Sequence, residues 1–286
     1  MIDSHFHIWR RADAKQSGIL AAPYLQRDAS WEDFRAASGD LALEGAVNIQ
    51  VNDFCDGTVE ARYIGVVAHG DPLLGAMIAW ARIESAEARG ELERLLGLAH
   101  VRGVRRTCQF EADPEFCASS DYVRGVRLLG ELDLLCEICV RLEQVKALPR
   151  LARACPETLI VLQHLGKPDH SQPPPAYWLR AIEELAALPN VLAKVSVVVH
   201  SDRDAALTTD LVAPFVRHVA GCFGPVRVFF GSNWPVAGAV VSYQGWVEML
   251  RELLGDDERF WAGNARRLYR LPPVTAVSRP IPLADL

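Results

Sequence analysis

The sequence has no excess of positive charge and no long run of apolar residues. Its 286 residues include 30 Lys and Arg against 36 Asp and Glu, which gives a formal net charge of −6. Nucleic acids and anionic membranes are bound by clustered basic side chains, so neither is expected as a partner. The apolar stretch Leu73–Ala81 is too short to span a membrane, and the charged residues Asp3 and Arg10 interrupt the beginning of the chain. We therefore expect a soluble, cytoplasmic protein without a signal peptide that acts on a small molecule.

Cysteine is also scarce. Seven cysteines are scattered from Cys55 to Cys222, and such an odd number is typical of reduced thiols rather than of a disulfide framework. Cys136 and Cys139 have the spacing of a metal-binding or redox pair. However, they lie in an apolar run with strand character, where residues three apart face opposite sides. We interpret them as core cysteines.

The chain has no glycine-rich phosphate turn after its first apolar run, which argues against an open doubly wound sheet, and no low-complexity linker divides it. It does contain eight apolar, β-prone runs that alternate with stretches of helical periodicity. The predicted strands are Ile2–Ile8, Gly45–Val51, Leu74–Ala81, Val101–Cys108, Leu134–Val140, Leu159–Gln163, Val191–Val197 and Val226–Phe230.

Predicted helices follow these strands, with a further short one after the last. They lie near Trp31–Leu41, Val59–Ala68, Ala86–Leu96, Tyr122–Leu132, Val145–Ala154, Tyr177–Ala187, Leu211–Cys222, Tyr243–Leu254 and Asp257–Tyr269. Eight strand-helix units in a chain of this length predict an α/β fold, a (β/α)₈ TIM-type barrel. We expect residues 1–271 to form this barrel as a single domain.

Three segments lie outside the alternation of predicted strands and helices. Arg10–Ser30 follows the first predicted strand and Asp169–Pro175 follows the sixth, so both are expected to lie over the catalytic mouth as lids. Residues 272–286 contain four prolines and form a tail that we expect to run extended over the barrel or a neighbouring subunit. A homo-oligomer is compatible with such a tail.

Two histidines, His5 and His7, alternate within the first predicted strand. Side chains two apart in a strand project from the same face, and two converging imidazoles can grip a metal ion or polarise an oxygen. Two ordinary, partly buried histidines would give the same pattern. The polar residues at the other strand ends decide between these interpretations, because barrel enzymes gather their active sites there.

The predicted strand ends are rich in such residues. In strand order they are His5 and His7; Gln50 and Asn52; Arg105, Arg106, Thr107 and Gln109; Arg141 and Glu143; Gln163 and His164; Lys194, Ser196 and His200; and Ser232 and Asn233.

Several of these residues need a specific environment. A guanidinium at the end of a buried strand needs an anionic partner, so Arg105 or Arg106 is expected to bind a carboxylate, and alternation does not decide which. Lys194 is a charge within an apolar strand and needs a partner or a lowered pKa. His164 favours a strand-end site, whereas His200 is balanced between site and loop. The remaining histidines are expected on the surface, namely His69, His100, His170 and His218.

Together these segments resemble the amidohydrolase superfamily, in the branch of sugar-lactone and dicarboxylate-lactone hydrolases such as the fuconolactonases. The resemblance implies a distorted barrel that hydrolyses small cyclic esters, in some relatives with one divalent metal ion and in others without. The matching segments, in the family's order, are Ile2–Trp9, Val101–Arg106, His164–Pro168, Ala193–Ser196, Phe230–Val236 and Gly263–Tyr269.

The resemblance, together with the strand-end analysis, gives each candidate residue a role. We expect His5, His7, His164 and Asn233 to be catalytic, and the three histidines are also the expected ligands of a Zn or Mn ion. Asp3 matches an acid that orients the first-strand site. Substrate contacts are expected from Arg105, Arg106, Gln109, Arg141, Lys194, His200 and Trp234.

The sequence departs from the family pattern at two positions. Gln163 stands where the family commonly has Asp, and Asn233 replaces the Asp of the eighth-strand motif. A carboxamide cannot accept the proton of an attacking water and adds no negative charge to a metal site, so metal binding should be weakened and metal-free operation becomes an option. A replacement base would come from His164, His200, Glu143 or a first-strand histidine.

Three functions therefore remain open. The first is hydrolysis of a lactone or related cyclic amide that carries a carboxylate or a polyol. The second is decarboxylation, which other members of the superfamily perform. The third is a binding protein whose catalytic base has been lost, with Asn233 as the sign of that loss.

Overall fold

Eight parallel strands form the centre of the computed structural model, which describes residues 1–13, 18–51, 57–98, 100–200 and 205–272. They pair in chain order, each parallel to the next. The predicted (β/α)₈ barrel is therefore confirmed. The strands are β1 (Ile2–Phe6), β2 (Gly45–Ile49), β3 (Leu74–Ala79), β4 (Val101–Val104), β5 (Leu135–Ile138), β6 (Ile160–Leu162), β7 (Val191–Val195) and β8 (Val228–Phe230).

The barrel closes through the segment that follows β8 rather than through β8 itself. Phe6 and Trp234 form an isolated parallel bridge. The His7 amide donates to the Trp234 carbonyl at 2.8 Å, and the Asn233 amide donates to the His5 carbonyl at 2.7 Å. The closure therefore places Asn233 directly beside the first-strand histidines.

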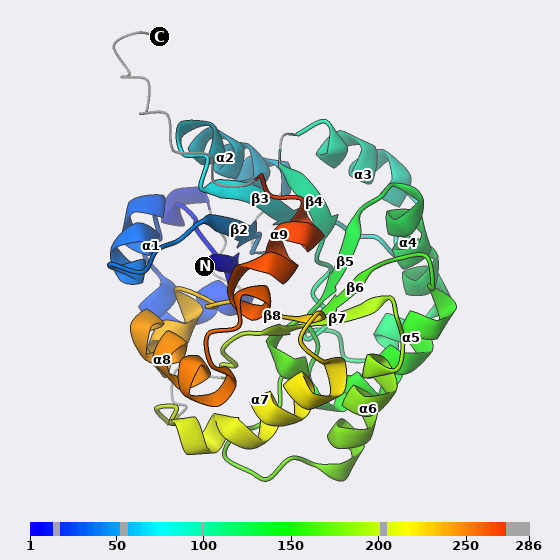
Figure 1. Ribbon diagram of the computed structural model, residues 1–286. Helices are drawn as coiled ribbons and strands as arrows, with labels where there is room; N and C mark the ends of the chain where they lie inside the picture. Colours follow the sequence, from blue (N-terminus) through cyan, green and yellow to red (C-terminus); the bar gives the residue numbers. More distant parts are fainter. Residues whose placement is uncertain (14–17, 52–56, 99, 201–204, 273–286) are drawn as a thin grey trace, which may run out of the picture.

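The helices surround the strands in chain order (Figure 1). Side-chain hydroxyls cap several of them, among them Ser30, Ser119, Thr208 and Ser242, which satisfies amides at the helix starts. Their bounds are α1 (Trp31–Ser38), α2 (Gly57–Gly70), α3 (Ala88–Leu96), α4 (Ser120–Glu131), α5 (Leu148–Ala154), α6 (Ala176–Ala186), α7 (Thr209–Phe223), α8 (Tyr243–Leu254) and α9 (Asn264–Tyr269).

Two apolar layers hold the barrel together. The outer layer lies between strands and helices, and Met77 and Ala79 of β3 belong to it. The inner layer fills the barrel with residues such as Ala76 and Ile78, and α9 contributes Tyr269 to it. Accordingly, α9 lies across one end of the barrel, close to the chain's first residue (Figure 1). The opposite end is open for a site.

Most strands end earlier than predicted. Val101–Cys108 was expected to form one strand, but β4 ends at Val104. Beyond it the amides of Cys108 and Gln109 both donate to the Cys139 carbonyl, at 2.9 and 3.2 Å, instead of continuing the ladder. The last predicted helix also divides into a π-helical turn, Arg259–Gly263, followed by α9. At the open end of the barrel, several polar residues of the predicted strand ends therefore lie beyond the strands, among them Arg105, Gln163 and Ser196.

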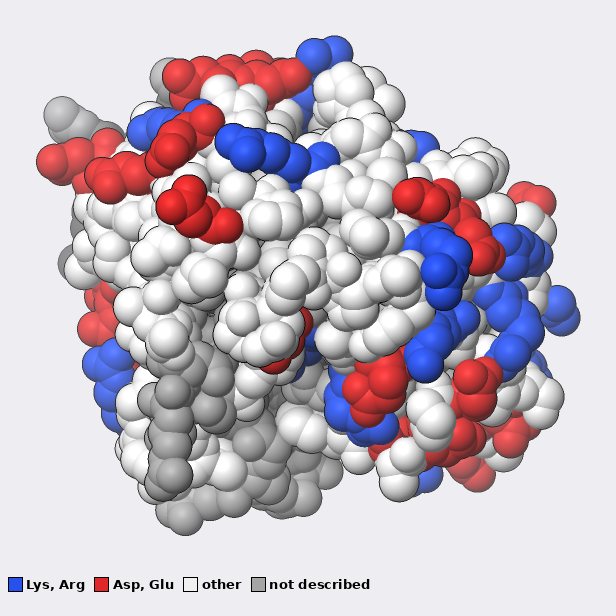
Figure 2. All heavy atoms as spheres, turned by 90° about the horizontal axis from the view of Figure 1, so that it is seen from below, with Lys and Arg blue, Asp and Glu red and all other residues white. Residues whose placement is uncertain are grey.

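Some predictions concern residues outside the described ranges: Asn52, Cys55 and all of the tail except Pro272. No described helix is long and apolar enough to cross a membrane. Figure 2 shows that, on the face in view, basic and acidic side chains are interspersed around largely uncharged surface. The homo-oligomer stays a prediction.

Candidate active site

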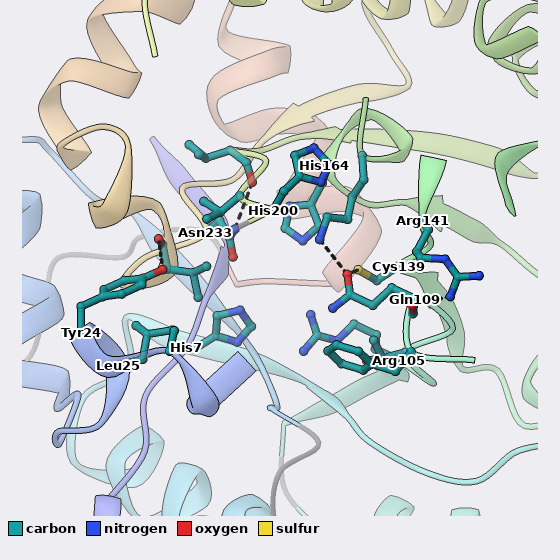
Figure 3. A pocket seen from close by; sticks show the side chains of 17 residues that line it. His7, Tyr24, Leu25, Arg105, Gln109, Cys139, Arg141, His164, His200 and Asn233 are labelled. Carbon is teal, nitrogen blue, oxygen red and sulfur yellow. Dashed lines mark hydrogen bonds between the residues drawn. The ribbon is translucent and has the colours of Figure 1, made fainter. Parts of the chain in front are cut away.

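A cavity of about 410 Å³ opens where the carboxyl ends of the strands meet, as expected for an enzyme with this barrel. Figure 3 shows His7, Arg105, His164 and Asn233 around one space. The predicted lid Arg10–Ser30 contributes to the cavity wall. The described lining residues are His7, Ala22, Tyr24, Leu25, Arg105, Thr107, Gln109, Phe110, Cys139, Arg141, His164, Lys167, Val197, Val199, His200, Asn233 and Val236.

The two first-strand histidines lie side by side, as predicted. The register between β1 and β2 shifts between Asp3 and Phe6. Asp3 therefore binds the Tyr243 hydroxyl at 3.0 Å, while the His5 and His7 rings meet each other with their Nε2 atoms 3.3 Å apart. Asp3 also accepts the amides of His5 and Ser232, both at 3.0 Å. It thus fixes the backbone of the site from outside, in keeping with its expected orienting role.

The tautomer of His7 follows from its neighbour. Its Nδ1 lies 2.5 Å from the Ile49 carbonyl oxygen, which can only accept, so Nδ1 carries the hydrogen and Nε2 carries the lone pair. Burial, and then the charge of Arg105, lowers the pKa of His7 to about 3, against opposing hydrogen bonds to Ile49 and the Asn233 side chain. His7 is therefore a neutral imidazole with a lone pair inside the site.

His164 presents the opposite atom to the cavity. The Ser196 hydroxyl accepts the His164 amide at 3.3 Å and lies 2.9 Å from its Nδ1. The hydroxyl keeps its hydrogen free for Nδ1, and in the tautomer in which it donates there, neutral His164 carries its own hydrogen on Nε2. Burial, and then the charge of Lys167, lowers the pKa of His164 well below its usual range. His164 is thus a donor to the cavity, whereas His7 is an acceptor.

The backbone around His164 is strained. His164, Leu165, Gly166 and Lys167 have φ values of 52°, 56°, 73° and 53°, in the left-handed region that non-glycine residues seldom adopt. Such strain concentrates at functional sites, where the surrounding structure enforces it. Here the turn brings His164 and Lys167 to the same cavity.

Asn233 is held by hydrogen bonds from both its backbone and its side chain. Its backbone has φ 59°, a conformation that Asn tolerates well, and its amide binds the His5 carbonyl. Its side-chain Nδ2 donates to the Val197 carbonyl oxygen at 3.0 Å, drawn as a dashed line in Figure 3. A carboxylate here would face that carbonyl oxygen without a hydrogen between them. The local structure therefore suits Asn rather than the Asp of the family pattern.

Of the two adjacent arginines, Arg105 faces the cavity. Arg105 is 7% exposed, and its guanidinium donates to the Gln50 carbonyl at 2.5 Å and to Gln163 Oε1 at 3.4 Å. Arg106 points elsewhere and pairs with Glu84 at 2.9 Å and Glu111 at 2.5 Å. This corrects the expectation that Arg106 contacts the substrate: two acids from flanking loops already neutralise it.

Lys194 is likewise not a cavity residue. It is fully buried inside the barrel, where its Nζ donates to Glu137 Oε2 at 2.6 Å and to the Ser4 carbonyl at 2.7 Å. Burial lowers the pKa of Lys194, and Glu137 opposes this. The expectation of substrate contact is corrected: the charge in the apolar strand has the partner that it needs.

Of the other residues predicted to contact the substrate, three line the cavity and one does not. Gln109, Arg141 and His200 line the cavity. Trp234 is not among the described lining residues, because its ring packs against Phe34 at a centroid distance of 5.7 Å. Arg141 also donates to Glu143 at 2.6 Å, which makes Glu143 an exposed ion-pair partner rather than a candidate base.

Lys167 and Cys139 are among the lining residues that had not been assigned to the site from the sequence. Lys167 donates to Gln109 Oε1 at 2.8 Å, and Cys139 lines the cavity although it was expected in the core. Cys136 does lie in the core, so the two cysteines face opposite sides as predicted. The motif His164–Pro168 could have indicated Lys167.

The second predicted lid borders a different space. Asp169, His170 and Ser171 line a second cavity, together with His200. His170 was expected to be a surface histidine, but it is only 8% exposed and its ring packs 4.9 Å from that of Phe215. The expectation of a surface histidine is corrected, because the loop packs His170 inward against α7, whereas the lid role of Asp169–Pro175 stays a prediction.

The comparisons with known proteins agree with this architecture. The family model described as amidohydrolase matches residues 2–271. The chain belongs to the amidohydrolase family. It is 30% identical to an L-fucono-1,5-lactonase of Burkholderia multivorans (95% of this chain, 96% of that protein) and 30% identical to one of Burkholderia ambifaria (94% and 95%). A zinc-bound amidohydrolase structure from Burkholderia multivorans superposes with a TM-score of 0.82 at 27% identity, covering 95% of this chain and 99% of that one.

The neighbouring structure holds a zinc ion, and the described residues of this chain offer only part of such a site. The 3.3 Å between the two Nε2 atoms is the spacing of two nitrogens on one tetrahedral zinc ion. Among the described residues, however, no group of three or more His, Cys, Asp or Glu side chains could hold a metal. Lys194 and Arg105 also place positive charge near both first-strand histidines. The described residues therefore supply half of a zinc site and do not fit a complete one.

Proposed function

We propose that this protein hydrolyses a small lactone that carries a carboxylate, and that it does so without a metal ion. The observation that carries the proposal is the convergence of an acceptor, His7, a donor, His164, and a cation, Arg105, on one cavity. Family membership and the similarity to two named lactonases support the reaction class. The cavity volume, about 410 Å³, suits a single small ring.

In this proposal the attacking water lies between His7 and Asn233. The His7 Nε2 lone pair, which faces His5 Nε2 at 3.3 Å in the resting site, turns to the water and accepts its proton, and the Asn233 side-chain amide, held by Val197, orients the water oxygen. A base with a pKa of about 3 is weak in the resting site. It gains proton affinity as negative charge develops on the lactone carbonyl oxygen beside it.

The carbonyl oxygen of the lactone lies at His164 Nε2 in this arrangement. When the tetrahedral intermediate collapses, the ring C–O bond breaks and the ring oxygen takes the proton back from His7 Nε2, which restores the neutral imidazole. A donor placed where charge develops stabilises the tetrahedral intermediate, an effect worth about 10²–10³ in rate in other hydrolases. The substrate carboxylate pairs with Arg105. Three cationic side chains line the cavity, Arg105, Arg141 and Lys167, and no described lining residue is acidic, which supports an anionic substrate.

A pH-stat assay on a panel of aldono- and dicarboxylate lactones tests the proposal. Ring opening releases one acid per turnover and consumes base. If only aromatic acids react and CO₂ is released, the protein is a decarboxylase. If every compound binds but none turns over, with or without Zn²⁺ or Mn²⁺, it is a binding protein.

Asn233→Asp should lower activity rather than raise it. The substitution removes the donor to the Val197 carbonyl and brings two acceptors together, at a cost of about 1–3 kcal/mol. We expect kcat/KM to fall about tenfold or more, with a lower Tm, and Asn233→Ala to show at least the same loss. An Asp variant faster than the parent would mean that the parent lacks the proton acceptor that the reaction uses.

Removal of metal ions should leave the activity unchanged within about twofold. The described donor set offers only the two nitrogens of His5 and His7, too few for tight Zn²⁺ binding. The measurement is kcat/KM after dialysis against a chelator, with metal analysis of the same sample. A loss that stoichiometric Zn²⁺ or Mn²⁺ restores would contradict the metal-free proposal.

We also propose a cytoplasmic location. The six cysteines that the structure describes are all free thiols, which suits a reducing compartment.

A further inference from the structure

Beneath the cavity lies a polar cluster that the proposed reaction does not use. Glu137, on β5, is fully buried and receives three donors: Lys194 at 2.6 Å and Gln163 at 2.5 Å on Oε2, and Tyr269 at 2.5 Å on Oε1. Lys194, Gln163 and Tyr269 are themselves fully buried. Buried charges are costly unless every bond is made, so this carboxylate holds its donors in one arrangement.

The cluster touches the site at three points. Gln163 directly precedes His164 in the chain. Lys194 donates to the carbonyl of Ser4, the residue before His5. The other end of the Gln163 amide, Oε1, accepts from the Arg105 guanidinium. One carboxylate is thus linked to the strands that carry both the histidines and the arginine.

The distances show which bond fixes the Gln163 amide. Its contact with Arg105 is long, at 3.4 Å, whereas its contact with Glu137 is short, at 2.5 Å. An ionised carboxylate only accepts, so it binds the amide nitrogen and leaves the amide oxygen for Arg105. If the amide were reversed, Oε1 would face the carboxylate and Nε2 would face the guanidinium, and both contacts would be repulsive.

We propose that Glu137 is a positioning residue for catalysis: through Gln163 it orients the Nη1 end of the Arg105 guanidinium, whose Nη2 end the Gln50 carbonyl holds, at the place where the substrate carboxylate binds. Glu137 itself touches no substrate. This inference rests on the proposed function, because it assumes that Arg105 meets a carboxylate. It also gives a role to Gln163, where the family pattern commonly has an acid: a neutral amide relays the orientation without adding charge beside Arg105.

The test must separate positioning from stability. Glu137→Gln alone leaves Lys194 buried without a counter-charge and risks misfolding. The informative variant is Glu137→Gln with Lys194→Met, which removes both charges together. The introduced amide can accept or donate, so it no longer dictates which end of the Gln163 amide faces Arg105. Tyr269→Phe is the matched control, because it removes a buried donor from Oε1, the carboxylate oxygen that Gln163 does not contact.

The readout is the substrate-charge preference, measured as kcat/KM for γ-butyrolactone-γ-carboxylate divided by kcat/KM for its carboxamide. We expect the double variant to fold and to lose about tenfold or more of this ratio, mainly through KM for the carboxylate. Tyr269→Phe should lower Tm and leave the ratio unchanged. An unchanged ratio in the folded double variant, or an equal fall in Tyr269→Phe, would overturn the inference.

A binding measurement separates the positioning role of Glu137 from the proposed hydrolysis of lactones. Tetrahydrofuran-2-carboxylate has no ester to hydrolyse, and its Kd can be measured by calorimetry. If the parent does not hydrolyse lactones but binds this anion, and the double variant binds it about tenfold more weakly, the proposed function fails and the positioning role stands. If the parent does not bind it, or the parent and the double variant bind it equally, the positioning role fails.

Discussion

His7→Asn should lower kcat for lactone hydrolysis by about 10³-fold, within the range that a positioned base contributes. The Asn side chain can still donate to the Ile49 carbonyl, the bond that His7 Nδ1 makes at 2.5 Å. It offers no lone pair at the position of Nε2. The substitution therefore removes the proton acceptor and retains the local hydrogen bond.

A stability measurement completes this test. The Tm of His7→Asn should stay within a few degrees of the parent, because the buried bond to Ile49 is preserved. A retained kcat in the folded variant would show that another group accepts the proton, with His200, which lines the same cavity, as the next candidate.

The pH dependence of the parent follows from the same histidine. Burial lowers the pKa of His7 to about 3, so its lone pair is present at any higher pH and is lost as the pH falls toward 3. The acid limb of kcat/KM should therefore lie below about pH 4. The unfolded chain binds this proton at a higher pH, near the ordinary histidine pKa of 6.5, so acid between the two values also destabilises the fold. An acid limb of kcat/KM near pH 6.5 would contradict the assignment of His7 as the proton acceptor.

Arg105→Met should raise KM for γ-butyrolactone-γ-carboxylate by about 30- to 100-fold, the range expected for losing a charge-assisted hydrogen bond. The guanidinium is 7% exposed at the cavity floor, where water screens it little. The carboxamide of the same lactone should show less than a threefold change, because it has no charge to pair. Initial rates on both compounds give the comparison.

Arg106→Met is the matched control for this prediction. It removes a neighbouring guanidinium of the same chemistry, but one that pairs with Glu84 and Glu111 away from the cavity. We expect a lower Tm without a change in the preference for the carboxylate. Equal effects of the two substitutions would show that Arg105 acts on the fold rather than on the substrate.

The barrel could be predicted from the sequence because its signal is local and repeated. Apolar β-prone runs and helical periodicity alternate eight times, and this alone specifies the order of elements. The meeting of His5 and His7 was predictable for a similar reason, since both lie on one strand. The shift of register between Asp3 and Phe6 was not, and it is what turns Asp3 toward Tyr243.

The assignment of the two arginines needed the structure. Alternation fails as a guide once the chain leaves the sheet, and β4 ends at Val104, directly before Arg105. What sends Arg106 outward is the pair Glu84 and Glu111, which reach it from loops. Their approach depends on tertiary packing that no local pattern encodes.

The pairing of Lys194 with Glu137 could have been predicted from the sequence. Each is a single charge within an otherwise apolar strand, and the two charges have opposite signs. Two such residues inside one barrel are expected to pair, because an isolated buried charge is costly. The bond between Asn233 and the Val197 carbonyl has no comparable signal, since it depends on the closure of the barrel.

The most direct test of the whole account is one comparison on the parent protein after treatment with a chelator. It is the ratio of kcat/KM for γ-butyrolactone-γ-carboxylate to that for the corresponding carboxamide, measured by pH-stat. The account predicts turnover without added metal and a ratio of about 30 or more, set by the cation at the cavity floor. No turnover of any lactone until Zn²⁺ or Mn²⁺ is added, or a ratio near one, would contradict it.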